Sequence, residues 1–452
     1  MSKLCRPVNR NPRAIPSLCP LHISRLRHTH AGNAGYRWSH PPNSLNFADD
    51  EVARLAAKPP HQLTLSDLMR HGKPPLKPDD LISSANFSLS LLPSRLARRI
   101  QALRNLPFIV VSNKHISKIY HNYLHSFSTL TIPYQQRQIT TVDEEIKFTE
   151  VMADLVQTHS NTIPILARGF LECRKYISPA DVTHFLDEHL RARIGTRLIA
   201  EQHIALHFAS QLMEADALGQ QLSPNPSTYI GVIDTDLRPA DIIRSCEAFV
   251  SEICELKYGV RPRVMINGND NASFTHVPVH LEYIITELLK NSFRAVVENG
   301  QEREPIEVTI ATAPDQVSEP SLEEEKASNS TSSSLKSPGI IQGLETSAPG
   351  MTIRIRDRGG GISPENLSNI WSYNFTTFGD DDVLDLSCNG SNDGLNMLSG
   401  AGGYSSSIAG LGYGLPLSRA YAEYFGGGIA IQSLWGWGTD VYLHLRGIGK
   451  LS

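Results

Sequence analysis

The sequence predicts an α+β protein, with an N-terminal helical bundle of four helices followed by a C-terminal α/β sandwich built on a mixed sheet. Three observations favour this fold class. Apolar residues recur at three- and four-residue spacing from about 60 to 220, a Pro- and Ser-rich break follows at 223–227, and beyond 230 a two-residue alternation appears between helical stretches. Helices joined by short loops favour an antiparallel bundle, and strands mixed with helices favour helices packed on one face of a sheet.

Composition supports two folded domains and excludes several classes of protein. The chain has 452 residues, 40% of them hydrophobic and 19% charged, which is enough for two cores. No uninterrupted run of about 18 apolar residues occurs, so a transmembrane protein is excluded. Lys and Arg (42) nearly balance Asp and Glu (46), so no global basic excess favours nucleic acid. The six cysteines form no Cys-x-x-Cys pair, and we expect reduced thiols.

The first 40 residues differ in charge from the rest of the chain. They hold one Lys and six Arg, and the first acidic residue is Asp49. An Arg-rich, acid-free N-terminus with interspersed Ser and His is typical of an organelle presequence, because the potential on the matrix side draws in a basic segment. We therefore expect a presequence at 1–40; a disordered basic tail is the alternative.

The helical bundle is expected at 60–225. Two apolar stripes repeat at three- and four-residue steps, and the stretches 143–158 and 194–212 follow the same rule less clearly. The first stripe comprises Ile116, Ile119, Tyr120, Tyr123, Leu124 and Phe127, and the second comprises Val182, Phe185, Leu186 and Leu190.

The sandwich domain is expected at 230–450. Apolar and polar residues alternate at 306–310, 351–355 and 441–445, which predicts half-buried strands, and helices are predicted at 278–298 and 414–425. Residues 315–349 hold nine serines and an acidic run at 323–325. So few large apolar residues cannot offset the entropy of ordering, and we expect a disordered insertion between two neighbouring strands.

One stripe of the predicted helix 278–298 carries polar chemistry. Glu287, Lys290, Asn291 and Arg294 fall at three- and four-residue steps on one face, while apolar residues occupy another. A carboxylate, an amide oxygen and two cations therefore lie side by side. Alone, this pattern also fits a solvated helix face.

Three glycine-containing segments add to this stripe. Asp357 ends a predicted strand and precedes Gly359 to Gly361, where the carboxylate can accept from an exocyclic amine and the glycines allow a flat ligand to approach. The segment 410–415 leads into a helix, which predicts a seat for phosphate on backbone amides. Thr439 opens the last strand and could support the Asp357 contact. Taken singly, each segment also fits a tight turn.

Together, these segments resemble the GHKL superfamily of ATP-binding proteins, whose Asn box, two glycine boxes and closing Gly-Thr they match. More closely, the chain is similar to the mitochondrial 2-oxoacid dehydrogenase kinases, a family that includes the pyruvate and branched-chain dehydrogenase kinases. The resemblance runs from Leu68 to Gly447. It includes the segments 92–100, 193–197, 202–203, 257–259 and 418–424.

The resemblance implies a GHKL-type sandwich and a protein serine kinase that uses ATP and Mg²⁺. Glu287 matches the family's catalytic carboxylate, Asn291 its magnesium ligand and Asp357 its adenine contact. Residues 376–409 match its ATP lid. Some relatives hold K⁺ through carbonyls that correspond to Ile370, Ser372 and Phe375. The other expected nucleotide contacts are Arg294, Gly359, Gly361, Thr376, Thr377, Gly410, Leu411, Gly412, Gly414, Leu415 and Thr439.

The same resemblance implies partners and a location. The substrate would be a serine on the decarboxylating subunit of a 2-oxoacid dehydrogenase complex in the mitochondrial matrix, with a lipoyl domain as the dock. A homodimer is expected, without nucleic acid and without membrane insertion. Tyr283 stands where pyruvate-type kinases usually carry a histidine, and the chain ends soon after its last strand. Both features favour the branched-chain type.

Two other functions fit parts of the pattern. A histidine kinase shares the ATP-binding domain but needs an exposed acceptor histidine, for which His203 or His207 is a candidate. No Glu-x-x-Arg-Thr-Pro segment follows them. A non-catalytic regulator that binds ATP and docks on the complex is the second alternative, although the presence of Glu287 and Asn291 argues against it.

Overall fold

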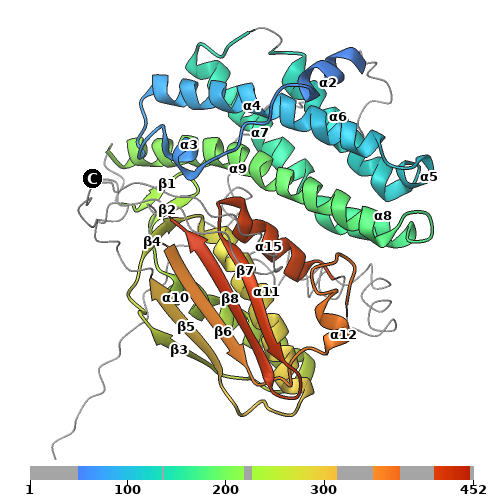
Figure 1. Ribbon diagram of the computed structural model, residues 1–452. Coiled ribbons are helices and arrows are strands. Elements are labelled where there is room, and N and C mark those ends of the chain that lie inside the picture. Colours follow the sequence, from blue (N-terminus) through green and yellow to red (C-terminus); the bar gives the residue numbers. More distant parts are fainter. Residues whose placement is uncertain (1–48, 135–136, 218–226, 313–349, 377–411, 448–452) are drawn as a thin grey trace, which may run out of the picture.

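The computed structural model describes residues 49–134, 137–217, 227–312, 350–376 and 412–447. A helical N-terminal region precedes a mixed sheet that is covered by helices, which confirms the predicted fold class (Figure 1). The expected presequence at 1–40, the insertion at 315–349 and the lid residues 377–409 lie outside the described residues.

The helical region is organised around two long helices, α4 and α9. Helix α4 packs against α2, α6, α7 and α9, and α9 also packs against α7. Ile116, Ile119, Tyr123 and Phe127 of the first predicted stripe are buried in this core. The second stripe and the stretch 194–212 belong to one continuous helix, α9. The helices are α2 (Asp49–Ala56), α3 (Leu65–Met69), α4 (Pro78–Arg104), α5 (Phe108–Val111), α6 (Lys114–Thr131), α7 (Val142–Thr158), α8 (Thr162–Glu172) and α9 (Pro179–Ala217).

The C-terminal region contains a five-stranded sheet of order β3-β5-β6-β8-β7. β3 runs parallel to β5 and the other pairs are antiparallel, so the sheet is mixed. A smaller antiparallel sheet has the order β1-β2-β4. The strands are β1 (Tyr229–Ile230), β2 (Ile233–Leu237), β3 (Val264–Gly268), β4 (Phe274–His276), β5 (Ile306–Thr312), β6 (Gly350–Asp357), β7 (Gly428–Leu434) and β8 (Gly438–Arg446).

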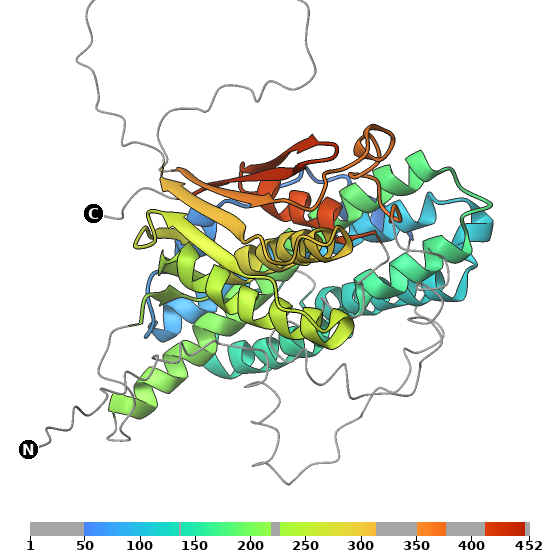
Figure 2. The same ribbon diagram turned by 90° about the horizontal axis from the view of Figure 1, so that it is seen from below.

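Helices cover one face of this sheet (Figures 1 and 2). They are α10 (Pro239–Tyr258), α11 (Pro278–Glu298) and α15 (Gly414–Tyr424), and a short α12 (Pro364–Leu367) follows β6. Every second residue of β6 is buried, and Met351, Ile353 and Ile355 pack with Leu281 and Ile285 of α11 in one core. This packing fixes α11 across the strand that ends in Asp357.

The two regions meet where α15 packs against α9. Arg191 of α9 forms an ion pair with Glu423 of α15, and its Nε also lies 3.0 Å from Asp187 Oδ2. The bundle core continues across this junction to include Tyr413 and Leu417. The start of α15 is therefore held from both sides.

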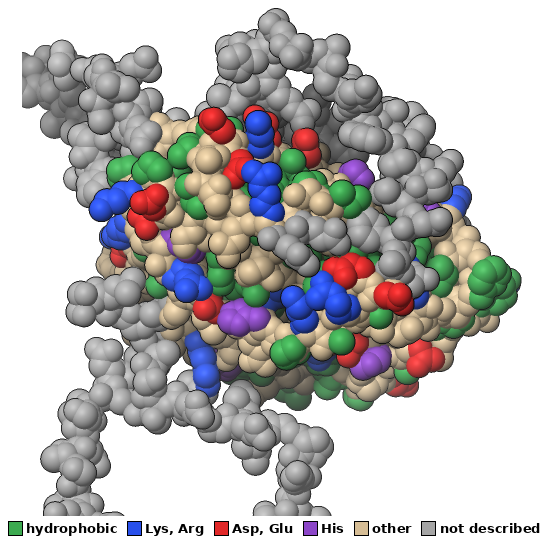
Figure 3. Space-filling view, turned by 90° about the horizontal axis from the view of Figure 1, so that it is seen from above, with side chains coloured by type: hydrophobic (Ala, Val, Ile, Leu, Met, Phe, Trp, Pro, Cys, Tyr) green, Lys and Arg blue, Asp and Glu red, His purple; other side chains and the backbone are tan. Residues whose placement is uncertain are grey.

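The molecular surface and the thiols add two observations. Within the residues that the structure describes, no helix combines the length and the apolar character needed to cross a bilayer. Acidic, basic and apolar side chains are interspersed on the face shown in Figure 3. Cys173, Cys246 and Cys254 are buried free thiols, as expected for them.

A buried histidine makes the stability of this fold sensitive to acid. His276 of β4 is 1% exposed, and neither of its ring nitrogens has a hydrogen-bond partner among the described residues. Burial lowers its pKa from the ordinary 6.5 to about 4. Because the unfolded chain binds this proton first, stability is intact above about pH 6.5 and falls as the pH drops toward about 4, by roughly 3 kcal/mol at most.

We expect His276→Phe to weaken this acid sensitivity, since the new ring keeps the stacking on Phe274, whose centroid lies 5.4 Å away. The free energy of unfolding in urea, measured from pH 8 to pH 4, checks this. At pH 8 the variant should be at least as stable as the wild type, because no buried polar nitrogen remains. Parallel pH profiles for the two proteins would contradict the prediction.

Candidate functional site

The polar stripe predicted on helix 278–298 lies on α11, and the structure pairs two of its members. Glu287 is 8% exposed, and its Oε1 lies 2.8 Å from Lys290 Nζ. Arg294 Nε lies 2.6 Å from Glu298 Oε1, and Asn291 is exposed. The carboxylate is thus nearly enclosed and orientated by a neighbouring cation, whereas the amide of Asn291 faces solvent.

The predicted phosphate segment reaches this carboxylate. Helix α15 begins at Gly414, and a Cβ atom on that residue would overlap Glu287 Oε2. Two segments far apart in the sequence therefore touch at the N-terminus of α15, where backbone N–H groups favour anions. Leu415 is half-buried against the sheet core. Gly410 and Leu411 lie outside the described residues.

The turn before α15 rests on the segment that leads into the expected lid. Gly412 has a φ of +72°, and a Cβ atom there would overlap the carbonyl oxygen of Phe375. The Ser372 carbonyl accepts the Phe375 N–H at 3.4 Å. Thr376 is half-buried and Ile370 lies in the turn after α12, while Thr377 lies outside the described residues. The structure thus brings Gly412 against Phe375.

Asp357 occupies the end of β6 beneath α11. It is 5% exposed, its Oδ1 accepts the Gly359 N–H at 2.9 Å, and its Oδ2 accepts the Ser292 hydroxyl at 3.2 Å. Burial raises the pKa of this carboxyl, and these hydrogen bonds oppose the rise in part. Thr439 is its register partner on β8, and the Thr439 hydroxyl lies 3.2 Å from Ser433 Oγ. Thr439 therefore lies beside Asp357 while its hydroxyl contacts Ser433, and its support of Asp357 stays a prediction.

The glycines after Asp357 allow close packing. A Cβ atom on Gly359 would overlap Ala295 of α11. Gly361 has a φ of +74°, and a Cβ atom there would overlap the carbonyl oxygen of Leu434 in the hairpin that joins β7 to β8. These glycines let α11, the end of β6 and that hairpin pack closely together at one end of the central strands.

Two further residues at the site, Ser292 and Tyr283, are not marked by any local sequence pattern. By its spacing Ser292 falls among the apolar residues of α11, yet its hydroxyl donates a hydrogen bond to Asp357 Oδ2. A single hydroxyl among apolar residues on one helix face indicates a buried hydrogen bond, because buried polar groups are nearly always paired. Tyr283 is half-buried one helical turn before Glu287, with its hydroxyl enclosed and unpaired among the described residues and its ring 5.1 Å from that of Tyr421. Burial, foremost, and the Glu287 charge raise its pKa.

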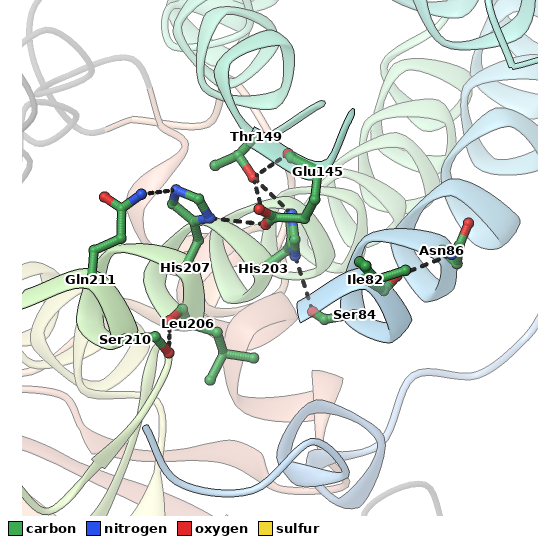
Figure 4. A network of polar contacts seen from close by, with 10 residues as sticks. All are labelled: Ile82, Ser84, Asn86, Glu145, Thr149, His203, Leu206, His207, Ser210 and Gln211. Carbon is green, nitrogen blue, oxygen red and sulfur yellow. Dashed lines mark hydrogen bonds and ion pairs between the residues drawn. The ribbon is translucent and has the colours of Figure 1, made fainter. Parts of the chain in front are cut away.

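The candidate phosphoacceptor histidines of the bundle are buried in a polar network (Figure 4). His203 is 0% exposed, and its nitrogens lie 2.9 Å from Thr149 Oγ1 and 3.0 Å from Ser84 Oγ. His207 Nδ1 lies 2.9 Å from Glu145 Oε1. Since an acceptor nitrogen must reach a phosphate, this enclosure argues against the histidine kinase alternative.

The arrangement supports nucleotide chemistry. Glu287 can take a proton, the N-terminus of α15 can hold phosphate, and Asp357 can accept from a base amine. The cradle formed at Gly412 and Gly414 leaves no room for side chains, because Phe375 and Glu287 occupy that space, so the turn before α15 packs closely against both residues. Mg²⁺ prefers oxygen ligands and keeps several waters, which fits one exposed amide such as Asn291 together with phosphates.

Two known protein families match separate segments of the chain. Residues 62–234 match the family described as mitochondrial branched-chain alpha-ketoacid dehydrogenase kinase. Residues 276–447 match the family of histidine kinase-, DNA gyrase B- and HSP90-like ATPases.

Similar proteins carry pyruvate-type names. A mitochondrial pyruvate dehydrogenase (acetyl-transferring) kinase of Arabidopsis thaliana is 30% identical over 86% of this chain and 90% of its own length. Kinase 1 of Saccharomyces cerevisiae is 29% identical over 88% and 87%, and human isozyme 4 is 26% identical over 91% and 87%. These names do not support the preference for a branched-chain type that Tyr283 and the short C-terminus suggested.

Proposed function

The chain belongs to the mitochondrial 2-oxoacid dehydrogenase kinases, and from that premise we propose that it transfers the γ-phosphate of ATP to a serine on the decarboxylating subunit of the pyruvate dehydrogenase complex. It is an ATP-dependent protein kinase. The observation that carries the proposal is the contact between Glu287 and Gly414, because it joins a proton acceptor to a phosphate seat. The choice of the pyruvate complex follows the names of the relatives.

In this proposal Glu287 is the general base. It takes the proton of the acceptor hydroxyl as that oxygen attacks the γ-phosphorus, and Lys290 keeps the carboxylate in position at 2.8 Å. Bound ATP supplies the phosphoryl group. Phosphoryl transfer depends mainly on positioning and charge neutralisation, and the close contact of Glu287 with the start of α15 keeps the carboxylate beside the proposed phosphate site.

We assign nucleotide recognition to the end of the central strand β6, where Asp357 lies. Asp357 accepts from the adenine amine, while Ser292 and Gly359 hold its two oxygens. Asn291 would hold Mg²⁺ together with phosphate and water. The further proposed nucleotide contacts are Arg294, Gly361, Thr376, Thr377, Gly410, Leu411, Gly412, Gly414, Leu415 and Thr439.

Several finer assignments rest on the family alone. K⁺ at the carbonyls of Ile370, Ser372 and Phe375 gains no support from the relatives' names. A homodimer, a lipoyl domain as the dock and the mitochondrial matrix as the location are likewise proposals. The relatives are mitochondrial by name, and the basic segment 1–40 agrees with import.

Incubation with radiolabelled ATP tests the proposed function. The purified full-length chain is mixed with the pyruvate complex or, separately, with the branched-chain complex. We expect acid-stable label on the decarboxylating subunit of the pyruvate complex. Acid stability excludes phosphohistidine, and phosphoamino acid analysis of the labelled subunit then identifies phosphoserine. Greater labelling of the branched-chain complex would overturn the substrate assignment.

Two further outcomes separate the alternatives. Acid-labile label on the chain itself, abolished by His203→Asn, would establish the histidine kinase. Binding of ATP without transfer to either complex would establish the non-catalytic regulator.

A further inference from the structure

We propose that one end of the helical bundle docks peripherally on an anionic phospholipid surface. The contact centres on an apolar tip, Phe108 and Ile109, which begin the short helix α5 and are 87% and 47% exposed. Figure 1 shows α5 at the far end of the helical region, and Figure 3 shows apolar side chains protruding at the corresponding end of the molecule. The inference goes beyond the proposed kinase function, which concerns the site around Glu287.

The fold holds this apolar tip outward. Val110 is 0% exposed and Leu106 is half-buried, so the chain is packed in the bundle core on both sides of the tip. Pro107 restricts the backbone before the helix, and the Ser112 N–H closes the turn by donating to the Phe108 carbonyl at 2.9 Å. The tip therefore stays on the surface although it is apolar.

Basic side chains lie near the apolar tip. Lys114 and Lys118 are one turn apart at the start of α6, and Arg174 and Lys175 follow the end of α8; all four are exposed. Residues 104–121 contain no acid, whereas the whole chain carries a net charge of −4. This end of the bundle is therefore basic on a chain that is slightly acidic overall.

The end of α8 is fixed beside the start of α6. Asn113 Nδ2 donates to Glu172 Oε2 at 2.8 Å, and His115 Nε2 lies 3.2 Å from Glu172 Oε1. The next acid along the chain, Asp181, accepts the Ser178 hydroxyl at 2.6 Å at the start of α9. These contacts bring the cations of the two helices to one end, and they engage the nearby acids in local hydrogen bonds.

This combination favours a lipid surface over a protein partner. A stable protein interface needs about 800 Å² from each partner, whereas α5 has four residues and two exposed apolar side chains. A fluid bilayer accepts a protruding apolar side chain without a complementary pocket, and anionic headgroups attract the flanking cations. Tyr176, which is 56% exposed after α8, belongs to a residue type enriched at membrane–water interfaces. Such a contact at the level of the headgroups needs no membrane-spanning helix.

Vesicle binding by the full-length chain tests the inference. Vesicles of phosphatidylcholine mixed with phosphatidylglycerol supply the anionic surface, and vesicles of phosphatidylcholine alone are the neutral reference. We expect cosedimentation with the anionic vesicles that weakens as salt is added, because salt screens surface charges. Affinity for neutral vesicles should be at least about tenfold lower.

Two substitutions at this end of the bundle should weaken the binding. Phe108→Asp should lower the affinity for anionic vesicles at least about tenfold, and an acid is compatible with the first residue of a helix. Lys175→Glu should lower it about tenfold by reversing one charge. Both side chains are exposed, so the variants should stay folded and transfer phosphate in solution like the wild type.

Leu256→Asp and Arg303→Glu are the matched controls. Leu256 is 71% exposed near the end of α10, and Arg303 is exposed after α11, so the same chemical changes are made away from the helical bundle. Each control should bind anionic vesicles within about twofold of the wild type, as is usual for a surface substitution outside a binding site.

Three results would overturn the inference. If Phe108→Asp binds anionic vesicles as tightly as the wild type, another segment, such as the basic residues 1–40, makes the contact. If the wild type ignores the vesicles while Phe108→Asp weakens its association with the dehydrogenase complex, the apolar tip docks on a protein instead. Equal binding to neutral and anionic vesicles would show that the cations take no part.

Discussion

Glu287→Gln is expected to lower transfer to the acceptor protein by about 10²- to 10⁴-fold, which is the range for loss of a general base. The amide has nearly the same shape, so it fits against Gly414, but it cannot take the proton of the serine hydroxyl. Affinity for ATP should stay within about threefold, because no nucleotide contact is assigned to this carboxylate. Single-turnover transfer of labelled phosphate, together with calorimetric titration of ATP, measures the two effects separately.

Glu255→Gln provides the control for this experiment. Glu255 is an exposed acid at the end of α10, where it pairs with Arg261 at 2.5 Å, away from the sheet edge that carries the site. The same chemical change there should leave both transfer and ATP affinity unaltered. If Glu287→Gln keeps more than a tenth of the wild-type rate, another group must take the proton and the assignment of Glu287 is wrong.

The helices and strands could be predicted from local sequence patterns, because the formation of each one depends mainly on residues close together in the sequence. The helix predicted at 278–298 is α11 (Pro278–Glu298), and the alternation at 351–355 lies within β6. Non-local contacts could not be predicted in this way. A glycine such as Gly359 suggested approach to a ligand, whereas its position also serves packing against Ala295.

Polar residues show the same division between local and non-local information. The spacing of Glu287 and Lys290 follows from one helix, so it could be predicted. The hydroxyl of Ser292 acts on Asp357 across the space between a helix and a strand, which no local pattern contains. The sequence alone made His203 a plausible phosphoacceptor. Its burial could not be predicted, because it depends on how α4, α7 and α9 pack together.

Gly412→Ala is the second change with a large expected effect. At a φ of +72° a side chain costs about 1–2 kcal/mol, and the new Cβ atom would also overlap the carbonyl oxygen of Phe375. A backbone atom cannot rotate away as a flexible side chain can. We therefore expect the phosphate turn and the segment before the lid to separate, and the affinity for ATP to fall at least about tenfold, measured by calorimetric titration.

Gly259→Ala separates the backbone effect from the contact. Gly259 ends α10 with the same φ of +72°, but a Cβ atom there would meet nothing within 4 Å. This variant should lose about 1 kcal/mol of stability in urea and bind ATP like the wild type. If both variants bind ATP equally well, the contact between Gly412 and Phe375 does not shape the nucleotide site. If only Gly412→Ala loses ATP while remaining folded, the cradle before α15 holds the triphosphate, because the two glycines share their backbone conformation and differ in what lies beside them.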